Sequence, residues 1–374
     1  MEFKISVEEL QSIVDRLSTL VKINEDDVTG MMMIEVGDDV KFKATDGSIN
    51  LVITNNQCEI ISTGKVLLKF KDVKGYISKF VPLVDGYGTK EFHIVVEGPE
   101  GLIKAKTHFQ TNKPSYRRLR FKTLKTDVYP AVKPFGEAQL ILNSAILKRG
   151  IGKVMHCVNP GDVRRAITGL NVVIKNDGIV FAGTNGIKLE EFELDINADI
   201  EQSSYVLKYT FASVLRAILD DDAQVFIKFE GSHVYIKSND MYIIGSLIIN
   251  ESYPNYRPMF ELEKVITFTR LDFSDGVHTV MDVLDPEDNH RLSITFAGNE
   301  LLLKNDVVES TQEFDDPFES NLDIDINGEF LDSILNDFTS EKLELHFTDG
   351  NNYIVFKAPE SDKHTALLTV VKRR

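Results

Sequence analysis

The sequence lacks tryptophan and contains only two cysteines, Cys58 and Cys157, among its 374 residues. Two cysteines exclude a disulfide framework and offer no paired-cysteine motif for zinc. No apolar run approaches the roughly 18 residues of a membrane-spanning helix, so the sequence predicts no membrane partner. The amino terminus carries two early glutamates and no apolar segment, unlike a signal peptide. These absences together predict a cytoplasmic protein.

Basic residues are also in short supply, since 42 lysines and arginines face 58 acidic residues and give a net charge of −16. A charge of that sign, taken over the whole chain, argues against a nucleic-acid partner. The distribution is uneven, however. The segment from Lys104 to Lys125 holds eight basic residues and no acidic one. A local basic surface therefore remains possible in an acidic protein.

The best-defined pattern lies in the stretch Val206–Asp240. A short strand is followed by a predicted helix whose apolar residues Phe211, Val214, Leu215 and Ile218 recur at helical spacing. Two alternating segments with a Gly231-Ser232 turn then predict a β-hairpin. The stretch therefore predicts one strand–helix–hairpin unit.

This unit recurs six times, with a period of about 62 residues, as is typical of a repeat architecture. The other five predicted helices each follow a short strand and precede a hairpin; they span Val7–Val21, Asp72–Val84, Ala145–Val158, Asp272–Leu284 and Gly328–Phe338. One such unit cannot bury its own apolar face, so two units would share a core. The sequence thus predicts an α+β fold of three similar domains, at residues 1–132, 133–260 and 261–374.

Three segments of the middle third resemble a known family, the bacterial replicative sliding clamp (the β subunit of DNA polymerase III). They are Gly161–Asn171 (GDVRRAITGLN), Phe181–Leu189 (FAGTNGIKL) and Leu247–Pro258 (LIINESYPNYRP), and Thr45-Asp46-Gly47 echoes the second of them in the first domain. The family's usual proline-leucine segment after the first helix is missing, and Lys22–Thr29 stands in its place. Such divergence is typical of a distant or phage-encoded member.

The resemblance implies a ring of two head-to-tail copies, with helices around the hole and sheets outside. Such a ring encircles double-stranded DNA without reading its sequence and tethers the replicative DNA polymerase. A clamp loader and the second copy of the chain are the other implied partners. The family has no catalytic activity and implies no cofactor.

Basic residues on the predicted helices would face the phosphates in such a ring and attract DNA independently of sequence. The candidates are Arg16, Lys71, Lys74, Lys79, Lys148, Arg149, Lys153, Lys208 and Arg216. An ordinary solvated helix face carries lysines as well, so each residue also fits that simpler interpretation. The two helices of the last third are instead neutral or acidic on this face.

The family also has an apolar site between its second and third domains that accepts a short peptide from polymerases and the clamp loader. The matching positions are Ile167, Thr184, Gly186, Ile187, Lys188, Leu189, Pro254, Pro258, Met259, Asn327, Phe330, Tyr353, Leu368, Val370, Val371 and Arg373. Ile187 replaces a usual histidine, Lys188 a usual arginine, and Pro258 a frequent arginine. The preferred peptide is therefore expected to differ. Ile167 and Leu189 fit an ordinary core position equally well.

The dimer interface is predicted from opposed charge on two sheet edges, which sets register and steers association. Lys104 and Lys106 in the first domain would meet Glu309 and Glu313 in the third domain of the other copy. The run Arg117–Lys122 stays open between a DNA contact and the interface.

Other motifs are excluded by their spacing. The acidic DPEDNH segment at 285–290 matches no calcium loop or zinc motif, and the sequence predicts no metal site. Gly183–Gly186 lacks the lysine of a phosphate loop, and no catalytic constellation is present. Two alternatives to the clamp are a repeat-built structural protein of a virion that binds no DNA, and a hydrolase with a site assembled across repeats.

Overall fold

The computed structural model describes residues 1–80, 88–98, 100–108, 115–196, 202–248, 251–283, 290–350, 352–359 and 363–371; for residues 88, 90, 104–108 and 115–116 it describes only the backbone. The chain forms two compact units. The amino-terminal unit comprises Met1–Ala145 and Ser213–Leu247, and the carboxyl-terminal unit comprises Ile146–Ala212 and Ile248–Arg374. The division into three domains stays a prediction.

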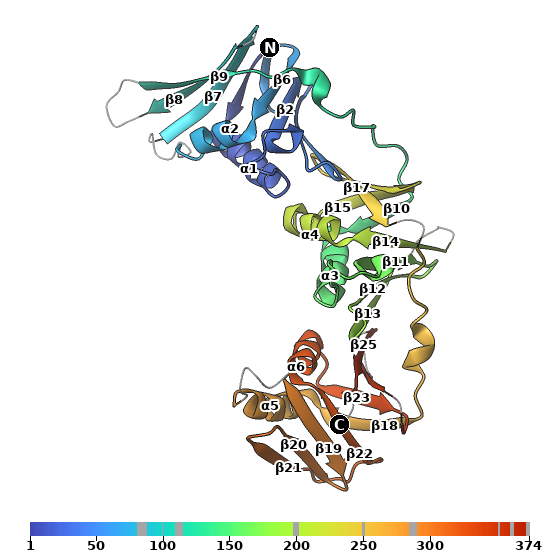
Figure 1. The fold of residues 1–374 in the computed structure, drawn as a ribbon. Coiled ribbons are helices and arrows are strands. Elements are labelled where there is room, and N and C mark those ends of the chain that lie inside the picture. The colour runs from blue at the N-terminus through green and yellow to red at the C-terminus, as the bar shows by residue number, and fades with distance from the viewer. Residues whose placement is uncertain are drawn as a thin grey trace. The chain divides into compact units, whose positions relative to one another are not determined.

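Six α-helices lie within the described residues, and each follows directly on a strand (Figure 1). The strand–helix pairs are β1 (Glu2–Ser6) with α1 (Val7–Ser18), β6 (Gly64–Lys69) with α2 (Phe70–Ile77), β10 (Leu140–Asn143) with α3 (Ser144–Met155), β14 (Ser203–Lys208) with α4 (Tyr209–Ile218), β18 (Lys264–Thr269) with α5 (Arg270–Met281) and β22 (Leu322–Asn327) with α6 (Gly328–Asp337). The six predicted strand–helix units are confirmed.

Several helices end earlier than their apolar pattern predicts. The helix predicted over Asp72–Val84 begins at Phe70 and ends at Ile77, where Ser78 caps it by donating its backbone N–H to Lys74. Phe80 still packs in the core, but from the turn after the helix. The spacing of apolar residues shows which side chains are buried, but it does not show where the helix ends.

All six predicted hairpins form as antiparallel pairs. They are β2 (Met31–Val36) with β3 (Val40–Thr45), β7 (Gly88–Glu97) with β8 (Glu100–His108), β11 (Gly169–Ile174) with β12 (Gly178–Thr184), β15 (Gln224–Glu230) with β16 (His233–Ser238), β19 (Arg291–Ala297) with β20 (Glu300–Lys304) and β23 (Lys342–Phe347) with β24 (Tyr353–Lys357). The repeat is therefore real in structure as well as in sequence.

The remaining strands complete two sheets in each unit. They are β4 (Asn50–Asn55), β5 (Glu59–Ser62), β9 (Ser115–Lys122), β13 (Lys188–Asp195), β17 (Met241–Ile248), β21 (Glu309–Glu313) and β25 (His364–Thr369). The amino-terminal unit holds the order β5-β1-β7-β8-β9 and the order β17-β4-β3-β2-β6, which β16, β15 and β10 extend from β17. The carboxyl-terminal unit holds β18-β23-β24-β25-β13-β12-β11-β14 and β21-β20-β19-β22.

Two turns show how closely the repeats agree. The Thr45 hydroxyl donates to the Ile49 carbonyl at 2.8 Å and accepts from the Gly47 amide at 3.1 Å. The Thr184 hydroxyl makes the same two bonds, to the Lys188 carbonyl at 2.7 Å and from the Gly186 amide at 3.0 Å. Both glycines have positive φ, which a side chain would disfavour. Equivalent positions therefore carry equivalent turn chemistry.

The helices pack their apolar faces on the sheets. In the carboxyl-terminal unit α5 and α6 lie side by side (Figure 1), and Phe273 of α5 and Leu331 of α6 are fully buried in one core with Phe296 of β19. Burying one such side chain contributes about 1.5–3 kcal/mol. The predicted helix faces are largely confirmed, although Val214 and Phe330 are only partly buried. No helix among the described residues is long and apolar enough to cross a membrane.

Glu35 of β2 gives a pH-dependent contribution to stability. The side chains of Lys43 and Lys65 bond to its carboxylate and lower its pKa to about 2. Because the pKa is lower in the folded chain, this stabilisation is present above the unfolded value and is lost as pH falls towards 2. The side chain is 26% exposed, so the effect is modest.

We expect the wild type to lose about 1 kcal/mol more than Glu35→Gln in the free energy of unfolding between about pH 5 and pH 2.5. Urea unfolding at several pH values measures the difference. Glu261→Gln, at an exposed position in the other unit, is the control and should follow the wild type. Parallel pH curves for wild type and Glu35→Gln would contradict the assignment.

Candidate partner-binding and DNA-binding surfaces

The predicted partner-binding residues gather around the junction of β13 and β25. These strands pair antiparallel from Lys188 opposite Leu368 to Phe192 opposite His364. Side chains alternate between the two faces of such a sheet. The predicted residues therefore divide into a group on each face and a group at the strand ends.

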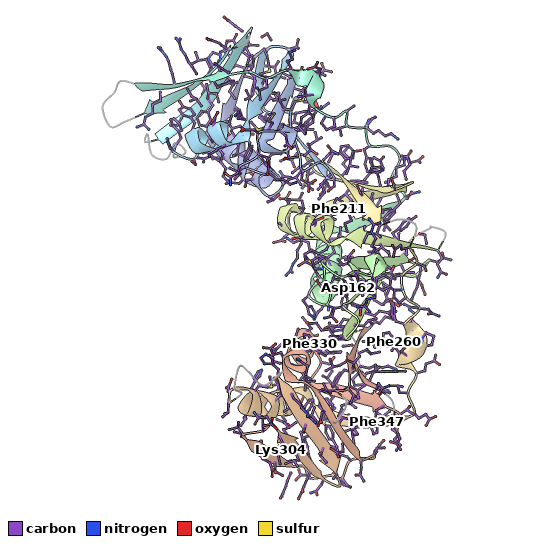
Figure 2. The ribbon with its side chains drawn as sticks, viewed as in Figure 1. Asp162, Phe211, Phe260, Lys304, Phe330 and Phe347 are labelled. Carbon is purple, nitrogen blue, oxygen red and sulfur yellow. The ribbon has the colours of Figure 1, made fainter. Side chains whose placement is uncertain are left out.

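One face carries an aromatic cluster. Leu189, Met259 and Tyr353 pack with Tyr256 and with Phe260 of the short helix η4 (Arg257–Phe260), labelled in Figure 2. The Tyr256 hydroxyl donates to Glu191, and the Arg257 guanidinium pairs with the same carboxylate at 3.0 Å. Burial raises the pKa of the Tyr256 hydroxyl above its usual range. Tyr256 therefore stays protonated and fixes η4 against β13.

The opposite face meets helix α6. Lys188 is only 5% exposed, and its ammonium lies 5.4 Å from the centre of the Phe330 ring and 3.2 Å from the Ser333 hydroxyl. Asn327 caps α6 by accepting the Phe330 amide hydrogen at 2.9 Å. Phe330, labelled in Figure 2, is partly buried against the core that also contains Leu368 and Val370. This face is thus an ordered contact between a strand and a helix.

The strand ends expose apolar side chains. Ile187 is 46% exposed and Val371 is 40% exposed. The Ile187 carbonyl accepts from the Thr369 amide at 2.9 Å, which places the two strand ends side by side. A peptide binds through an apolar anchor residue. This residue requires exposed aliphatic side chains that lie over well-packed aromatic and aliphatic residues.

The other predicted members are less suited to contact a partner. Ile167, Thr184, Leu189 and Leu368 are buried, so they support the surface from below. Pro254, Pro258 and Gly186 are exposed. Arg373 lies outside the described residues. The assignment of these residues to a partner-binding site stays a prediction.

The basic residues predicted to face DNA lie in different surroundings. Lys71, Lys79 and Arg216 are exposed. Lys74 and Lys148 are partly buried, and the Arg149 guanidinium lies 5.0 Å from the centre of the Phe192 ring. Two positions differ from the expected helix: Lys79 follows the end of α2, and Lys208 is the last residue of β14.

Arg16 and Lys153 are among the predicted cations that have partners within the chain. Arg16 makes a two-pronged ion pair with Asp240 at 2.9–3.1 Å. Lys153 donates to the backbone carbonyl of Asp337. A paired cation attracts phosphate less strongly than a solvated one. Lys71, Lys79 and Arg216 are therefore the best placed of the predicted set.

The two oppositely charged segments lie at sheet edges. β9 ends its sheet and exposes Arg117, Arg118, Arg120 and Lys122. Lys104 and Lys106 belong to β8, one strand further in, and their side chains lie outside the described residues. β21 ends a sheet of the carboxyl-terminal unit and exposes Glu309 and Glu313. The edge position favours the β9 arginines, which sequence reasoning left undecided because it could not order the strands.

A further group of residues was not predicted. The fold brings His156, Cys157 and Glu190 together in the carboxyl-terminal unit. The only feature of the sequence that indicates this group is the His156-Cys157 pair just after the third helix. In the sequence, Glu190 does not differ from the other glutamates of its strand. In the predicted acidic segment 285–290, only His290 lies within the described residues.

Comparison with known proteins agrees with these features. The model of the family "DNA polymerase III beta subunit, central domain" matches residues 141–255. The beta sliding clamps of Mycoplasma capricolum and Rickettsia bellii are 25% and 21% identical to the chain, over 92% and 89% of its length and 92% and 91% of theirs.

Solved structures agree over the whole length. The DNA polymerase sliding clamp of Bacillus subtilis has a TM-score of 0.87 at 15% identity, and the DNA polymerase III subunit beta of Pseudomonas aeruginosa has a TM-score of 0.86 at 16% identity. Each alignment covers 100% of both chains. The predicted α+β clamp fold is confirmed. By all three comparisons, the chain is similar to bacterial-type sliding clamps at low sequence identity.

Proposed function

We propose that this protein is a DNA sliding clamp, a non-catalytic processivity factor that encircles duplex DNA and tethers a replicative polymerase. The observation that carries the proposal is the succession of six strand–helix–hairpin units, which match clamp structures along the entire chain. Relatives named beta sliding clamp support it. None of these matches supports a structural protein of a virion.

The product length of a polymerase on primed circular DNA tests this function. The protein, its matched polymerase and the matched clamp loader are expected to give products many times longer than polymerase and loader alone. Linearising the template should remove the gain, because a ring slides off a free end. Equal product lengths with and without the protein would overturn the proposal.

The proposed ring is a head-to-tail homodimer of three-domain chains. Its support is the opposed charge of β9 and β21, together with a hollow of about 320 Å³ beside the end of β21 whose rim carries Asp315, Asp316 and Glu319. Open strand edges form main-chain bonds readily, and a closed ring would cover them. Pairing of β9 with β21 of the other copy would join basic to acidic side chains.

The proposed partner surface consists of Ile187 and Val371 above the Phe330 and Tyr256 clusters. A clamp loader and a polymerase would compete for this surface, since both would present an apolar anchor to it. Bacterial replication takes place in the cytoplasm, so the proposal also places the protein there. A phage or a chromosomal origin is compatible with this function.

The proposed DNA-facing residues include Lys71 and Lys74 on one face of α2. We expect Lys71→Glu combined with Lys74→Glu to reduce the slope of log affinity against log salt by about 1–2, because up to two phosphate contacts are lost. Fluorescence anisotropy with a short duplex measures the slope. Lys237→Glu, at an exposed position of β16, is the control. Identical slopes for wild type and the double variant would remove α2 from the DNA surface.

A further inference from the structure

A cluster of side chains capable of binding metal lies where four elements of the carboxyl-terminal unit meet. His156 and Cys157 follow the end of α3, Glu190 lies in β13, Asp337 ends α6, and His364 begins β25. The predicted domains II and III both contribute. None of these residues belongs to the partner-binding or DNA-binding surfaces described above.

The donor atoms surround a single nitrogen. His156 Nε2 lies 2.8 Å from Glu190 Oε1, 3.0 Å from Asp337 Oδ2 and 3.3 Å from Cys157 Sγ. Cys157 Sγ lies 3.4 Å from Glu190 Oε1. In a tetrahedral zinc site with bonds of about 2.0–2.3 Å, ligand atoms are about 3.3–3.7 Å apart. The donor atoms of His156, Cys157 and Glu190 are therefore within about half an ångström of the spacing of three zinc ligands.

His156 and Cys157 are adjacent in sequence, and both can bind the same ion because helix α3 has already ended. α3 stops at Met155, and the Cys157 amide donates to the Val154 carbonyl in a turn. The turn directs the side chains of His156 and Cys157 to the same side, as the short distance between Nε2 and Sγ shows. In a continuous helix neighbouring side chains diverge by about 100°.

Glu190 is held in place from behind. His364 Nε2 donates to Glu190 Oε2 at 2.8 Å, and both side chains are completely buried. The His364 ring stacks on Phe338 at 4.2 Å and meets Phe192 edge-on at 5.7 Å. His364 Nδ1 is buried without a hydrogen-bond partner among the described residues. Carboxylates that bind metals are commonly oriented by such a bond.

The charge of the cluster favours a cation. Two carboxylates, those of Glu190 and Asp337, share the single His156 nitrogen. The nearby Lys153 ammonium donates to the backbone carbonyl of Asp337. A metal that binds the Cys157 sulfur would displace the thiol proton.

The site is open on one side only. The Glu190 side chain is completely buried and Cys157 is 0% exposed, whereas the side chains of His156 and Asp337 are 29% and 27% exposed. An ion would therefore enter past His156 and Asp337 and reach a thiol and a carboxylate fixed by the core. An ion pair with a purely structural role does not combine partly exposed residues at an opening with buried, fixed residues beneath them.

We propose that His156, Cys157 and Glu190 form a binding site for one Zn²⁺ ion, with Asp337 beside His156 at the open side of the site. Sulfur together with nitrogen selects zinc and its borderline neighbours over the hard ions Mg²⁺ and Ca²⁺, which prefer six or more oxygen ligands. The ion links the end of α3 to β13, and it does so independently of DNA.

Titration of the full-length protein with Co²⁺ after chelator treatment tests the site. A tetrahedral site containing Cys157 is expected to give the intense visible absorption of four-coordinate Co²⁺ and a near-ultraviolet thiolate charge-transfer band at one equivalent. Cys157→Ser should lose the charge-transfer band. The matched control Cys58→Ser, at a half-buried thiol in the other unit, should keep it.

If Cys157→Ser misfolds, a second variant still tests the site. His156→Gln changes a partly exposed side chain and should weaken Co²⁺ binding by at least the about 10–100-fold that loss of a supporting partner costs. Zn²⁺ should displace Co²⁺ and raise the Tm of wild type and Cys58→Ser more than that of His156→Gln. A wild type without the thiolate band, or a His156→Gln variant with unchanged Co²⁺ affinity, would overturn the proposal.

Discussion

The Ile187→Asp variant is expected to lose most of its affinity for the matched polymerase, by about 30-fold or more. Ile187 exposes 46% of its surface at the end of the turn before β13, where the resemblance places a partner's apolar anchor. A carboxylate there would have to be desolvated when the apolar anchor of the peptide binds. Fluorescence anisotropy or surface plasmon resonance measures the loss.

The fold of this variant should be intact, because the backbone of Ile187 makes its own bonds. Its amide donates to Asn185, and its carbonyl accepts from Thr369. Ile141→Asp in β10, at an aliphatic side chain that is 52% exposed, is the matched control and should bind normally. If Ile187→Asp and Ile141→Asp bind the polymerase equally well, the partner surface lies elsewhere.

Reversing the charge of one sheet edge is expected to convert the dimer into monomers of 42.2 kDa. In Arg118→Glu/Arg120→Glu, β9 would present acidic side chains to the acidic β21 of the other copy. Like charges opposed across an interface cost several kcal/mol, so the dissociation constant should rise by at least about 100-fold. The proposed ring has two such contacts, and both would be affected. Sedimentation velocity separates the two states.

Mixing complementary variants makes the test specific for head-to-tail pairing. Glu309→Lys/Glu313→Lys should also be monomeric, because both of its edges are basic. An equimolar mixture of the two double variants restores opposed charge at both contacts and should form dimers. Lys22→Glu/Lys237→Glu, at exposed positions outside both edges, should remain dimeric. Monomers in the mixture would contradict the proposed pairing of β9 with β21.

Periodicity was sufficient to predict the local architecture. Leu10, Ile13, Val14 and Leu17 recur at helical spacing and are all buried in α1. The alternation on either side of Gly231 predicts β15 and β16, which pair as expected. These features depend on neighbours within one unit of about 62 residues, so the sequence contains all the information that they require.

Features that depend on distant residues could not be predicted in this way. Nothing local distinguishes Lys104 in β8 from Arg118 in β9, and only the strand order shows which lies at the edge. Likewise, Glu190 and His364 are 174 residues apart and meet only because β13 pairs with β25. The burial of Lys188 depends on Ser333 of α6 in the same way.

Because β13 pairs with β25, the carboxyl-terminal unit can stay together even when the chain between these strands is cut. The segment 251–255, which leads from β17 towards η4, is largely exposed and is the natural place for a protease to cut. Main-chain hydrogen bonds from Lys188–Leu368 to Phe192–His364 would still join the two fragments. A nicked chain would therefore behave as one folded body, with Ile187 and Val371 still on neighbouring strand ends. A denaturing gel would show the cleavage, whereas measurements on the native protein would not detect it.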